Sequence, residues 1–283
     1  SRIVRTYNDY GSCLLKEFYN TGGELTTNEE GIASFYYSYD SHGNPILEEY
    51  YGADGQPALN SSGVFSVRWN WYEQGRVLEK NNYGLEREPV EDEWNVASYR
   101  WTMNEQGRIT EEKYYGSDNS LQRDRWGIAI YQWDYDNRGN RIEARCYDGW
   151  ESLTNDSRGV ASYRWDYDKQ RNRLGEHHYN AEGELTEDSQ GIARLTWTYD
   201  SEGRRIRQEQ FGLYGQLRAD SSGVAVYSWS HDRYGNVLEE AYAGIDGRPV
   251  ENNGGIALSR WEYDAEGTPL ASIHLDRNNR PYE

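Results

Sequence analysis

The sequence repeats itself every 32 residues, and this period constrains the fold more than any other feature. A glycine marks the same position in each copy except one, where Asn95 takes its place. An aromatic residue follows six positions later, and no insertion or deletion interrupts the register. The glycines are Gly31, Gly63, Gly127, Gly159, Gly191, Gly223 and Gly255; the aromatic residues are Tyr37, Trp69, Trp101, Trp133, Trp165, Trp197, Trp229 and Trp261. A fixed period of this length indicates a repeat architecture.

The repeat predicts how the chain is organised. We expect residues 1–283 to form a single repeat array. In this array, residues 1–30 are a partial repeat, residues 31–254 are seven full repeats, and residues 255–283 are a nearly complete last repeat. Because both ends fall inside a repeat, we expect the array to be part of a longer chain.

Each repeat carries the pattern of a β-hairpin. Ala161, Tyr163, Trp165 and Tyr167 alternate with polar residues, which is typical of a half-buried strand. An Asp-x-x-Gly turn such as residues 200–203 follows, and a second strand then runs from Ile or Leu to an aromatic residue. Two strands joined by a short glycine turn form an antiparallel hairpin.

The fold class predicted is therefore all-β: tandem 32-residue antiparallel β-hairpin repeats that form an elongated, curled, solenoid-like sheet. The alternative is a β-helix with one coil per repeat. A single repeat buries too little surface to fold alone, so stacking on neighbouring repeats must stabilise it. With 26 Tyr and 11 Trp and only 36% hydrophobic residues, we expect the recurring tryptophans to form an aromatic spine in place of an aliphatic core.

A Tyr-Asp-x-x-Gly-Asn/Arg motif recurs at the hairpin turns. It is present at residues 39–44, 135–140 and 199–204, and at 231–236 with His231 for Tyr, whereas Arg171 replaces the glycine in another copy. This motif resembles the YD repeats of bacterial Rhs-type proteins. The resemblance implies curling antiparallel β-strips in surface proteins and toxin shells, and a scaffold or adhesive role rather than catalysis.

Charge and hydropathy exclude several functional classes. The formal net charge of −18 argues against nucleic acid as a partner, since phosphate binding needs clustered Lys and Arg. No apolar run approaches the ~20 residues of a membrane helix, so we expect no membrane insertion. We expect the protein to lie outside the cytoplasm: at the bacterial cell surface, in the periplasm or in the secreted fraction.

The polar residues predict no catalytic residue, metal site or cofactor. Glu48–Glu49, Glu111–Glu112 and Glu239–Glu240 resemble carboxylate pairs, but neighbours along a strand point to opposite faces. The same holds for His177 and His178. We expect the acidic residues to be solvated strand edges and the turn aspartates to cap their turns rather than bind calcium.

Two cysteines are present, and we expect both to be unbridged. Cys13 and Cys146 lie more than four repeats apart in the sequence. In an extended stack of hairpins that separation is far beyond the ~7 Å between Cα atoms that a disulfide tolerates.

The candidate binding residues are aromatic residues that depart from the repeat pattern. Trp94 and Trp126 precede the repeat-marking position in adjacent repeats, where other copies carry Glu, Ser, Gln, Arg or Gly. Trp150 and Tyr214 occupy a loop turn where Asp or Glu is usual. Such residues can stack on sugar rings or grip a partner's side chains; alternatively, each covers the aromatic spine locally.

The sequence thus predicts a non-enzymatic β-repeat binding or scaffold module of a larger bacterial protein. Its expected partner is another protein or a glycan of the cell envelope or a host, and a choline-like cation is a further possibility through cation–π contact. The alternative is a structural spacer or shell segment without a ligand. A glycan hydrolase that uses acidic residues is the least favoured of the three.

Overall fold

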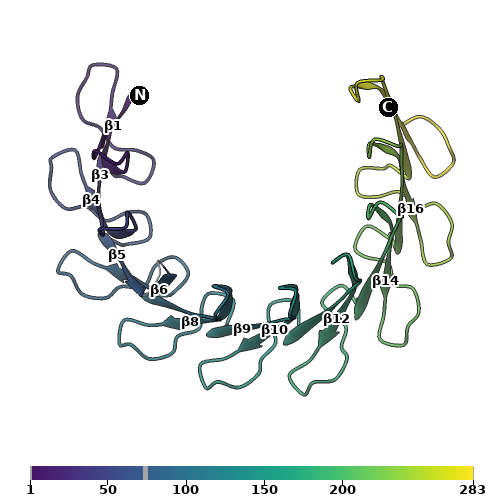
Figure 1. Cartoon of the computed structure of the whole chain (residues 1–283), viewed down its shortest axis with the longest axis horizontal. Coiled ribbons are helices and arrows are strands. Elements are labelled where there is room, and N and C mark those ends of the chain that lie inside the picture. Colours follow the sequence, from purple (N-terminus) through teal and green to yellow (C-terminus); the bar gives the residue numbers. More distant parts are fainter. Residues whose placement is uncertain (1, 73–75, 283) are drawn as a thin grey trace. The chain divides into compact units, whose positions relative to one another are not determined.

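The computed structural model describes residues 2–72 and 76–282, and in these residues the secondary structure is entirely β. Eighteen strands follow one another within the described residues (Figure 1). Their bounds are β1 Arg2–Tyr7, β2 Cys13–Tyr19, β3 Ser34–Tyr39, β4 Pro45–Tyr51, β5 Ser66–Tyr72, β6 Arg76–Tyr83, β7 Ser98–Met103, β8 Ile109–Tyr115, β9 Ile130–Tyr135, β10 Arg141–Tyr147, β11 Ser162–Tyr167, β12 Arg173–Tyr179, β13 Arg194–Tyr199, β14 Arg205–Phe211, β15 Val226–His231, β16 Val237–Ala243, β17 Leu258–Tyr263 and β18 Pro269–Leu275. Among the described residues there is no helix of the length and apolarity that crossing a membrane requires.

The strands form one open antiparallel sheet of hairpin repeats, which confirms the predicted fold class. Within each hairpin the pairing is long: β13 and β14 pair from Arg194 opposite Phe211 to Tyr199 opposite Arg205. Between hairpins it is short, with three residue pairs between β14 and β15. The alternative of one β-helix coil per repeat is wrong, because each repeat contributes two antiparallel strands whereas a β-helix stacks parallel ones.

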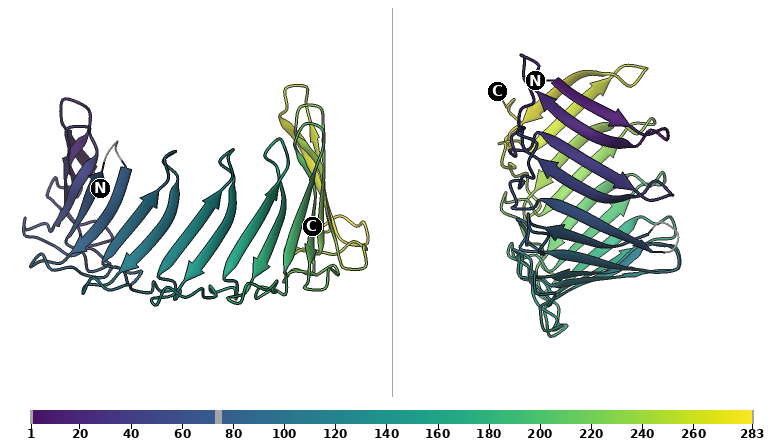
Figure 2. Two further views of the ribbon diagram at one scale, coloured as in Figure 1. Left: turned by 60° about the horizontal axis from the view of Figure 1, so that its bottom comes forward. Right: turned by 90° about the vertical axis from the view of Figure 1, so that its left-hand side faces the viewer.

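The chain divides into two compact units. The first comprises residues 1–133 and 146–152, and the second comprises residues 134–145 and 153–283. In each unit the short hairpin turns lie at one end of the strands, and the longer connections between hairpins lie together at the other end (Figure 2). The longer connections carry the candidate binding residues.

Side-chain caps and left-handed residues build the turns. In the turn after β13, Asp200 Oδ1 accepts hydrogen bonds from the backbone N–H groups of Glu202 (3.0 Å) and Arg204 (2.9 Å), and Gly203 has φ +79°. This is the predicted Asp-x-x-Gly turn, in which Gly adopts a positive φ without steric cost. Arg171 takes the same place after β11 with φ +72°.

A short contact closes each repeat over its hairpin. Pro57 forms an isolated bridge with Tyr51, and equivalent bridges join Leu185 to Tyr179 and Leu217 to Phe211. The residue that forms the bridge is a Pro or Leu in each of these connections. These contacts place the turn that precedes the next hairpin against the end of the previous one.

The centre of the core differs from the predicted aromatic spine. The most deeply buried side chains are the Ile or Val and the Ala that follow the repeat-marking position: Ile32, Ala33, Val64, Val96, Ala97, Ile128, Ala129, Val160, Ala161, Ile192, Ala193, Val224, Ala225 and Ala257. The tryptophans of the repeat are half-buried, apart from Trp197, which is 8% exposed. Consecutive buried residues are possible here because the segment just before each first strand is enclosed on both sides.

The aromatic residues instead form one side of the core, on the first strand of each hairpin. Tyr99 stacks on Trp101, two residues along β7, with ring centroids 6.0 Å apart. Several indoles also reach across their hairpins: Trp165 Nε1–H donates to Glu176 Oε2 at 2.8 Å, and Trp197 and Trp229 make equivalent bonds to Gln208 and Glu240. The polar edge of the ring is thereby satisfied while its apolar face packs on the neighbouring tyrosine.

Candidate functional site

Two of the candidate tryptophans contact each other in the first unit. Trp94 lies in the connection between β6 and β7 and Trp126 in the connection between β8 and β9. Their ring centroids are 4.6 Å apart with planes inclined by 43°. Trp126 remains 49% exposed, so the pair presents indole surface at the loop end of the strands.

Arg125, which lies in the same connection as Trp126, packs on this pair of indoles. The Arg125 guanidinium lies 3.5 Å from the Trp94 ring centroid and 4.8 Å from that of Trp126. Its backbone N–H donates to the Trp94 carbonyl at 3.0 Å, which ties the two connections together. Asn95 Nδ2 adds a second tie, to the Arg123 carbonyl at 3.1 Å. The two loops therefore hold the indoles in one arrangement through backbone as well as ring contacts.

Trp150 lies in the next connection of the first unit and is more open. Its side chain is 79% exposed, and the Arg123 guanidinium lies 4.7 Å from its ring centroid. Asp148 fixes both ends of this contact, because it caps the turn at the Trp150 N–H (2.9 Å) and pairs with Arg123 Nη2 (3.2 Å). A groove of about 560 Å³ lies here, lined by Arg123, Arg125, Trp150 and backbone of the adjoining turns.

Beneath the Trp94–Trp126 pair lies a smaller cavity of about 140 Å³. It is lined by these two tryptophans, Val96, Tyr99, Tyr114 and Asp124. The Asp124 side chain caps its turn through Oδ1, which accepts from the N–H groups of Trp126 (2.9 Å) and Ile128 (3.0 Å). Its other oxygen, Oδ2, is buried and accepts no hydrogen bond. Burial raises the pKa of Asp124, because the charged carboxylate is removed from water.

Tyr214, the fourth candidate, belongs to the second unit. It lies in the turn that follows β14 and is 89% exposed. Near it, the Leu213 N–H donates to Glu187 Oε1 at 2.9 Å, which fixes the backbone of the turn. The structure thus shows Trp94, Trp126 and Trp150 on consecutive connections of the first unit and describes Tyr214 separately.

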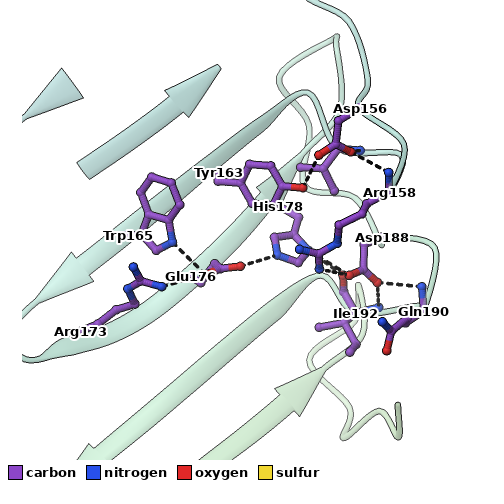
Figure 3. A network of polar contacts seen from close by, with 11 residues as sticks. Asp156, Arg158, Tyr163, Trp165, Arg173, Glu176, His178, Asp188, Gln190 and Ile192 are labelled. Atoms are coloured by element: carbon purple, nitrogen blue, oxygen red, sulfur yellow. Dashed lines mark hydrogen bonds and ion pairs between the residues drawn. The ribbon is translucent and has the colours of Figure 1, made fainter. Parts of the chain in front are cut away.

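The second unit contains a buried ionic network that the sequence patterns did not indicate (Figure 3). His178, fully buried in β12, places Nδ1 2.9 Å from the Ile192 carbonyl and Nε2 3.0 Å from Glu176 Oε1. The ring thus bridges the Ile192 carbonyl and the Glu176 carboxyl group. Arg158 reaches from the preceding connection to pair with Asp188 Oδ2.

This network lowers the pKa of both of its carboxylates. Burial alone would raise the pKa of Glu176, but hydrogen bonds from His178 and Trp165 outweigh it. Burial likewise acts to raise the pKa of Asp188, and hydrogen bonds from the Ile192 N–H and Arg158 outweigh it. Arg158 and His178 thus hydrogen-bond two carboxyl groups that are largely removed from water.

The carboxylate pairs diverge as predicted, but one member of each is not solvated. Glu112 faces inward, and burial raises its pKa although hydrogen bonds from Trp101 and Tyr114 act in the opposite direction. Burial also raises the pKa of Glu48, although a hydrogen bond from Tyr37 acts in the opposite direction. The expectation of fully solvated strand edges is therefore wrong for the inward glutamates, since they satisfy the polar edges of the aromatic rings.

The remaining polar candidates show no assembled site. His177 and His178 point to opposite faces, His177 toward Asp166 (2.9 Å) and His178 into the network. Within residues 2–72 and 76–282, no group of three or more His, Cys, Asp or Glu side chains could hold a metal ion. Cys13 and Cys146 do not form a disulfide.

Comparisons with known proteins place the chain in no family. No protein-family model matches it, and no curated protein matches it. Among solved structures, it is similar to the Tc holotoxin pore of Photorhabdus luminescens, with 12% identity over 97% of this chain and a TM-score of 0.47. It is also similar to the TcdB2–TccC3–Cdc42 structure (14% identity over 96% of this chain, TM-score 0.36) and to a porin-like protein from Bacteroides uniformis (9% identity over 92% of both chains, TM-score 0.30).

The chain spans only a small part of the toxin proteins it matches. It covers 13% of the Tc holotoxin chain and 15% of the TcdB2–TccC3–Cdc42 chain. All three TM-scores are below 0.5, so no conclusion on function is drawn from these similarities.

Proposed function

We propose that this chain is a non-enzymatic repeat module of a larger bacterial protein, displayed outside the cytoplasm, that binds a partner protein at the loop end of its first unit. One observation carries the proposal: three consecutive connections each expose or half-expose a tryptophan, and each tryptophan stacks on an arginine. Trp94 and Trp126 share Arg125, and Trp150 stacks on Arg123. Trp and Arg are the residues that dominate binding energy at protein interfaces.

The geometry favours a protein over a glycan at Trp94 and Trp126. Sugar stacking uses an open aromatic face, but these two rings already pack on each other and on Arg125. Trp150, at 79% exposed, is the residue that could stack on a sugar. The net charge of −18 also favours a partner segment with positive charge.

The test is a binding screen of the whole chain on an array of basic, neutral and acidic peptides and on a glycan array. We expect basic peptides to bind and the Trp126→Ala and Trp150→Ala variants to bind at least tenfold more weakly. Tyr234→Ala, which changes an exposed aromatic residue in a hairpin turn of the second unit, is the matched control and should bind as the unmodified chain does. Binding of glycans alone, lost on Trp150→Ala, would favour the glycan alternative. Absence of binding on both arrays would favour the spacer or shell alternative.

A further inference from the structure

The repeats follow an internal pairing rule that one repeat breaks. A buried residue of the second strand faces the turn residue ten positions later. Where the strand residue is Asn82 or Gln210, its amide donates to the carboxylate of Asp92 (3.1 Å) or Asp220 (3.2 Å). The full set pairs Phe18, Tyr50 and Tyr242 with Asn28, Asn60 and Asn252, and Asn82, Cys146, His178 and Gln210 with Asp92, Asp156, Asp188 and Asp220.

Tyr114 and Asp124 are the exception to this rule. An aromatic residue in the strand is matched by an uncharged Asn in three repeats, but here it is matched by an aspartate. The consequence is visible in the structure: Asp124 is 5% exposed and its Oδ2 accepts no hydrogen bond. A buried acceptor without a donor is costly, and this one lines the 140 Å³ cavity.

The network in Figure 3 shows what is missing at this position. Two repeats separate the two sites, so Asp188 corresponds to Asp124 and Glu176 to Glu112. Their turns have the same backbone geometry, because the Ser189 N–H donates to the Arg158 carbonyl (2.7 Å) as the Arg125 N–H donates to that of Trp94 (3.0 Å). Both carboxylates are therefore retained in equivalent places.

The two basic residues of the network, Arg158 and His178, are in contrast replaced by aromatic residues. Trp94 stands in the place of Arg158, and Tyr114 stands in the place of His178. The Asp124 site therefore keeps both carboxyl groups, Asp124 and Glu112, and has aromatic side chains in place of the two basic ones. The guanidinium that pairs with Asp188 Oδ2 has no counterpart at Asp124 Oδ2. The Arg125 guanidinium lies on the Trp94 and Trp126 rings but makes no hydrogen bond to Asp124 Oδ2, so this buried oxygen between aromatic side chains can still attract a cationic donor.

We propose that the cavity formed by Trp94, Trp126, Tyr99, Tyr114 and Asp124 accepts the guanidinium of an arginine side chain from a partner protein. The ligand would donate to Asp124 Oδ2 as Arg158 donates to Asp188 within the chain. The size of the cavity, about 140 Å³, fits the end of a side chain rather than a drug-sized ligand, whose pockets span roughly 300–1,000 Å³. This proposal rests on the proposed protein-binding function and names the chemistry that the partner supplies.

The test titrates the whole chain with three short peptides and follows the tryptophan indole N–H signals by NMR. The peptides are acetyl-Gly-Arg-Gly-amide, its citrulline analogue, which has the same shape without the charge, and its lysine analogue. We expect the arginine peptide to bind at least tenfold more tightly than either analogue. Equal binding of the citrulline peptide would overturn the need for a cation. Equal binding of the lysine peptide would overturn the choice of guanidinium.

Three variants locate the site. Asp124→Asn should weaken arginine-peptide binding at least tenfold. Asp220→Asn is the matched control, since Asp220 Oδ2 is already held by Gln210 (3.2 Å) and Tyr227 (2.5 Å), and it should leave binding unchanged. Trp94→Arg restores the residue found at position 158, so it should abolish peptide binding and raise the thermal midpoint by about 2 °C.

These outcomes separate this inference from the proposed function. If Trp94→Arg is stabilising but no arginine peptide binds the unmodified chain, the cavity has no ligand of this class and the inference is wrong. The array experiment with Trp150→Ala is independent of the cavity, so partner binding at the loop end can still stand. If array binding also fails, the proposed function falls together with it.

Discussion

Replacing His178 by Ala is expected to destabilise the second unit strongly. The imidazole is fully buried, and its Nδ1 is hydrogen-bonded to the Ile192 carbonyl while its Nε2 is hydrogen-bonded to Glu176. It also packs edge-on against Tyr163, with ring centroids 5.2 Å apart. Alanine removes all three interactions and leaves a cavity where the ring was.

The contacts set the size of the loss. The Ile192 carbonyl would keep its bond from the Asp188 N–H (2.8 Å) and lose the one to His178, and a lost hydrogen bond of this kind costs about 0.5–1.5 kcal/mol. The aromatic contact with Tyr163 contributes about 0.5–1.5 kcal/mol. Glu176 keeps its bonds to Trp165 (2.8 Å) and Arg173 (3.2 Å), so its loss is smaller. The expected decrease in the free energy of unfolding is therefore about 2–3 kcal/mol.

A second variant makes this reasoning specific. His178→Gln places at this position the side chain that its counterpart Gln210 has, whose Nε2–H donates to the Val224 carbonyl at 3.0 Å. The carbonyl bond should therefore be restored in His178→Gln, and the loss should shrink to about 1–2 kcal/mol, chiefly the aromatic contact with Tyr163 and the bond to Glu176. The order of stability is thus His, then Gln, then Ala.

Urea unfolding at pH 7, followed by tryptophan fluorescence and by circular dichroism, measures this order. Agreement between the two probes and an unchanged slope with urea show that the midpoints report stability. If His178→Ala unfolds within about 0.5 kcal/mol of the unmodified chain, or if Gln is no better than Ala, the carbonyl bond is not what stabilises this position.

Two further predictions concern single turns and the two kinds of buried aspartate. Arg171→Gly should stabilise the fold by about 0.5 kcal/mol, because relief of the strain of a positive φ outweighs the lost hydrogen bond to Asn140 (2.8 Å). Arg171→Ala keeps the strain and loses the bond, so it should be less stable than either the Gly variant or the unmodified chain. Urea midpoints measure this order. Asp188 and Asp124 should respond to pH with opposite signs in thermal unfolding. Burial would raise the pKa of Asp188, but the backbone N–H of its turn and Arg158 lower it, so its carboxylate stabilises the fold above the unfolded pKa of ~3.9 and this stability is lost as the pH falls through the folded pKa. Burial raises the pKa of Asp124, so its contribution is present below ~3.9 and is lost as the pH rises through the folded pKa; Asp124→Asn should therefore stabilise the chain at pH 7 by about 1 kcal/mol, and Asp188→Asn should destabilise it. Equal effects of the two substitutions at pH 7 would contradict this difference.

Local patterns were sufficient for the hairpins. The alternation from Tyr163 to Tyr167 and the Asp-x-x-Gly turns such as Asp200–Gly203 predicted strands and turns that the structure contains, because side-chain direction in a strand and the capping of a turn depend on residues only a few positions apart. The centre of the core was less predictable. Val160 stands beside Ala161 and both are buried, since the residues before the strand are enclosed from two sides and do not alternate.

The candidate site divides in the same way. Trp94 and Trp126 could be chosen from the sequence because they depart from the repeat, although their role in binding stays a prediction. Asp124 could not, because four other repeats also carry aspartate at its position. What distinguishes it is the residue facing it from the neighbouring strand, Tyr114, which supplies no donor to Oδ2.

By itself, the sequence determined the 32-residue repeat, the antiparallel hairpins and the placement of aromatic residues in the loops, since each follows from contacts within or next to one repeat. Only the tertiary structure decided that His178 and Arg158 contact the carboxyl groups of Glu176 and Asp188 and that Asp124 keeps an oxygen without a donor. The physical reason is that burial and hydrogen-bond satisfaction depend on which side chains meet across strands and between repeats. A charged residue has the same letter in the sequence whether it is balanced or not.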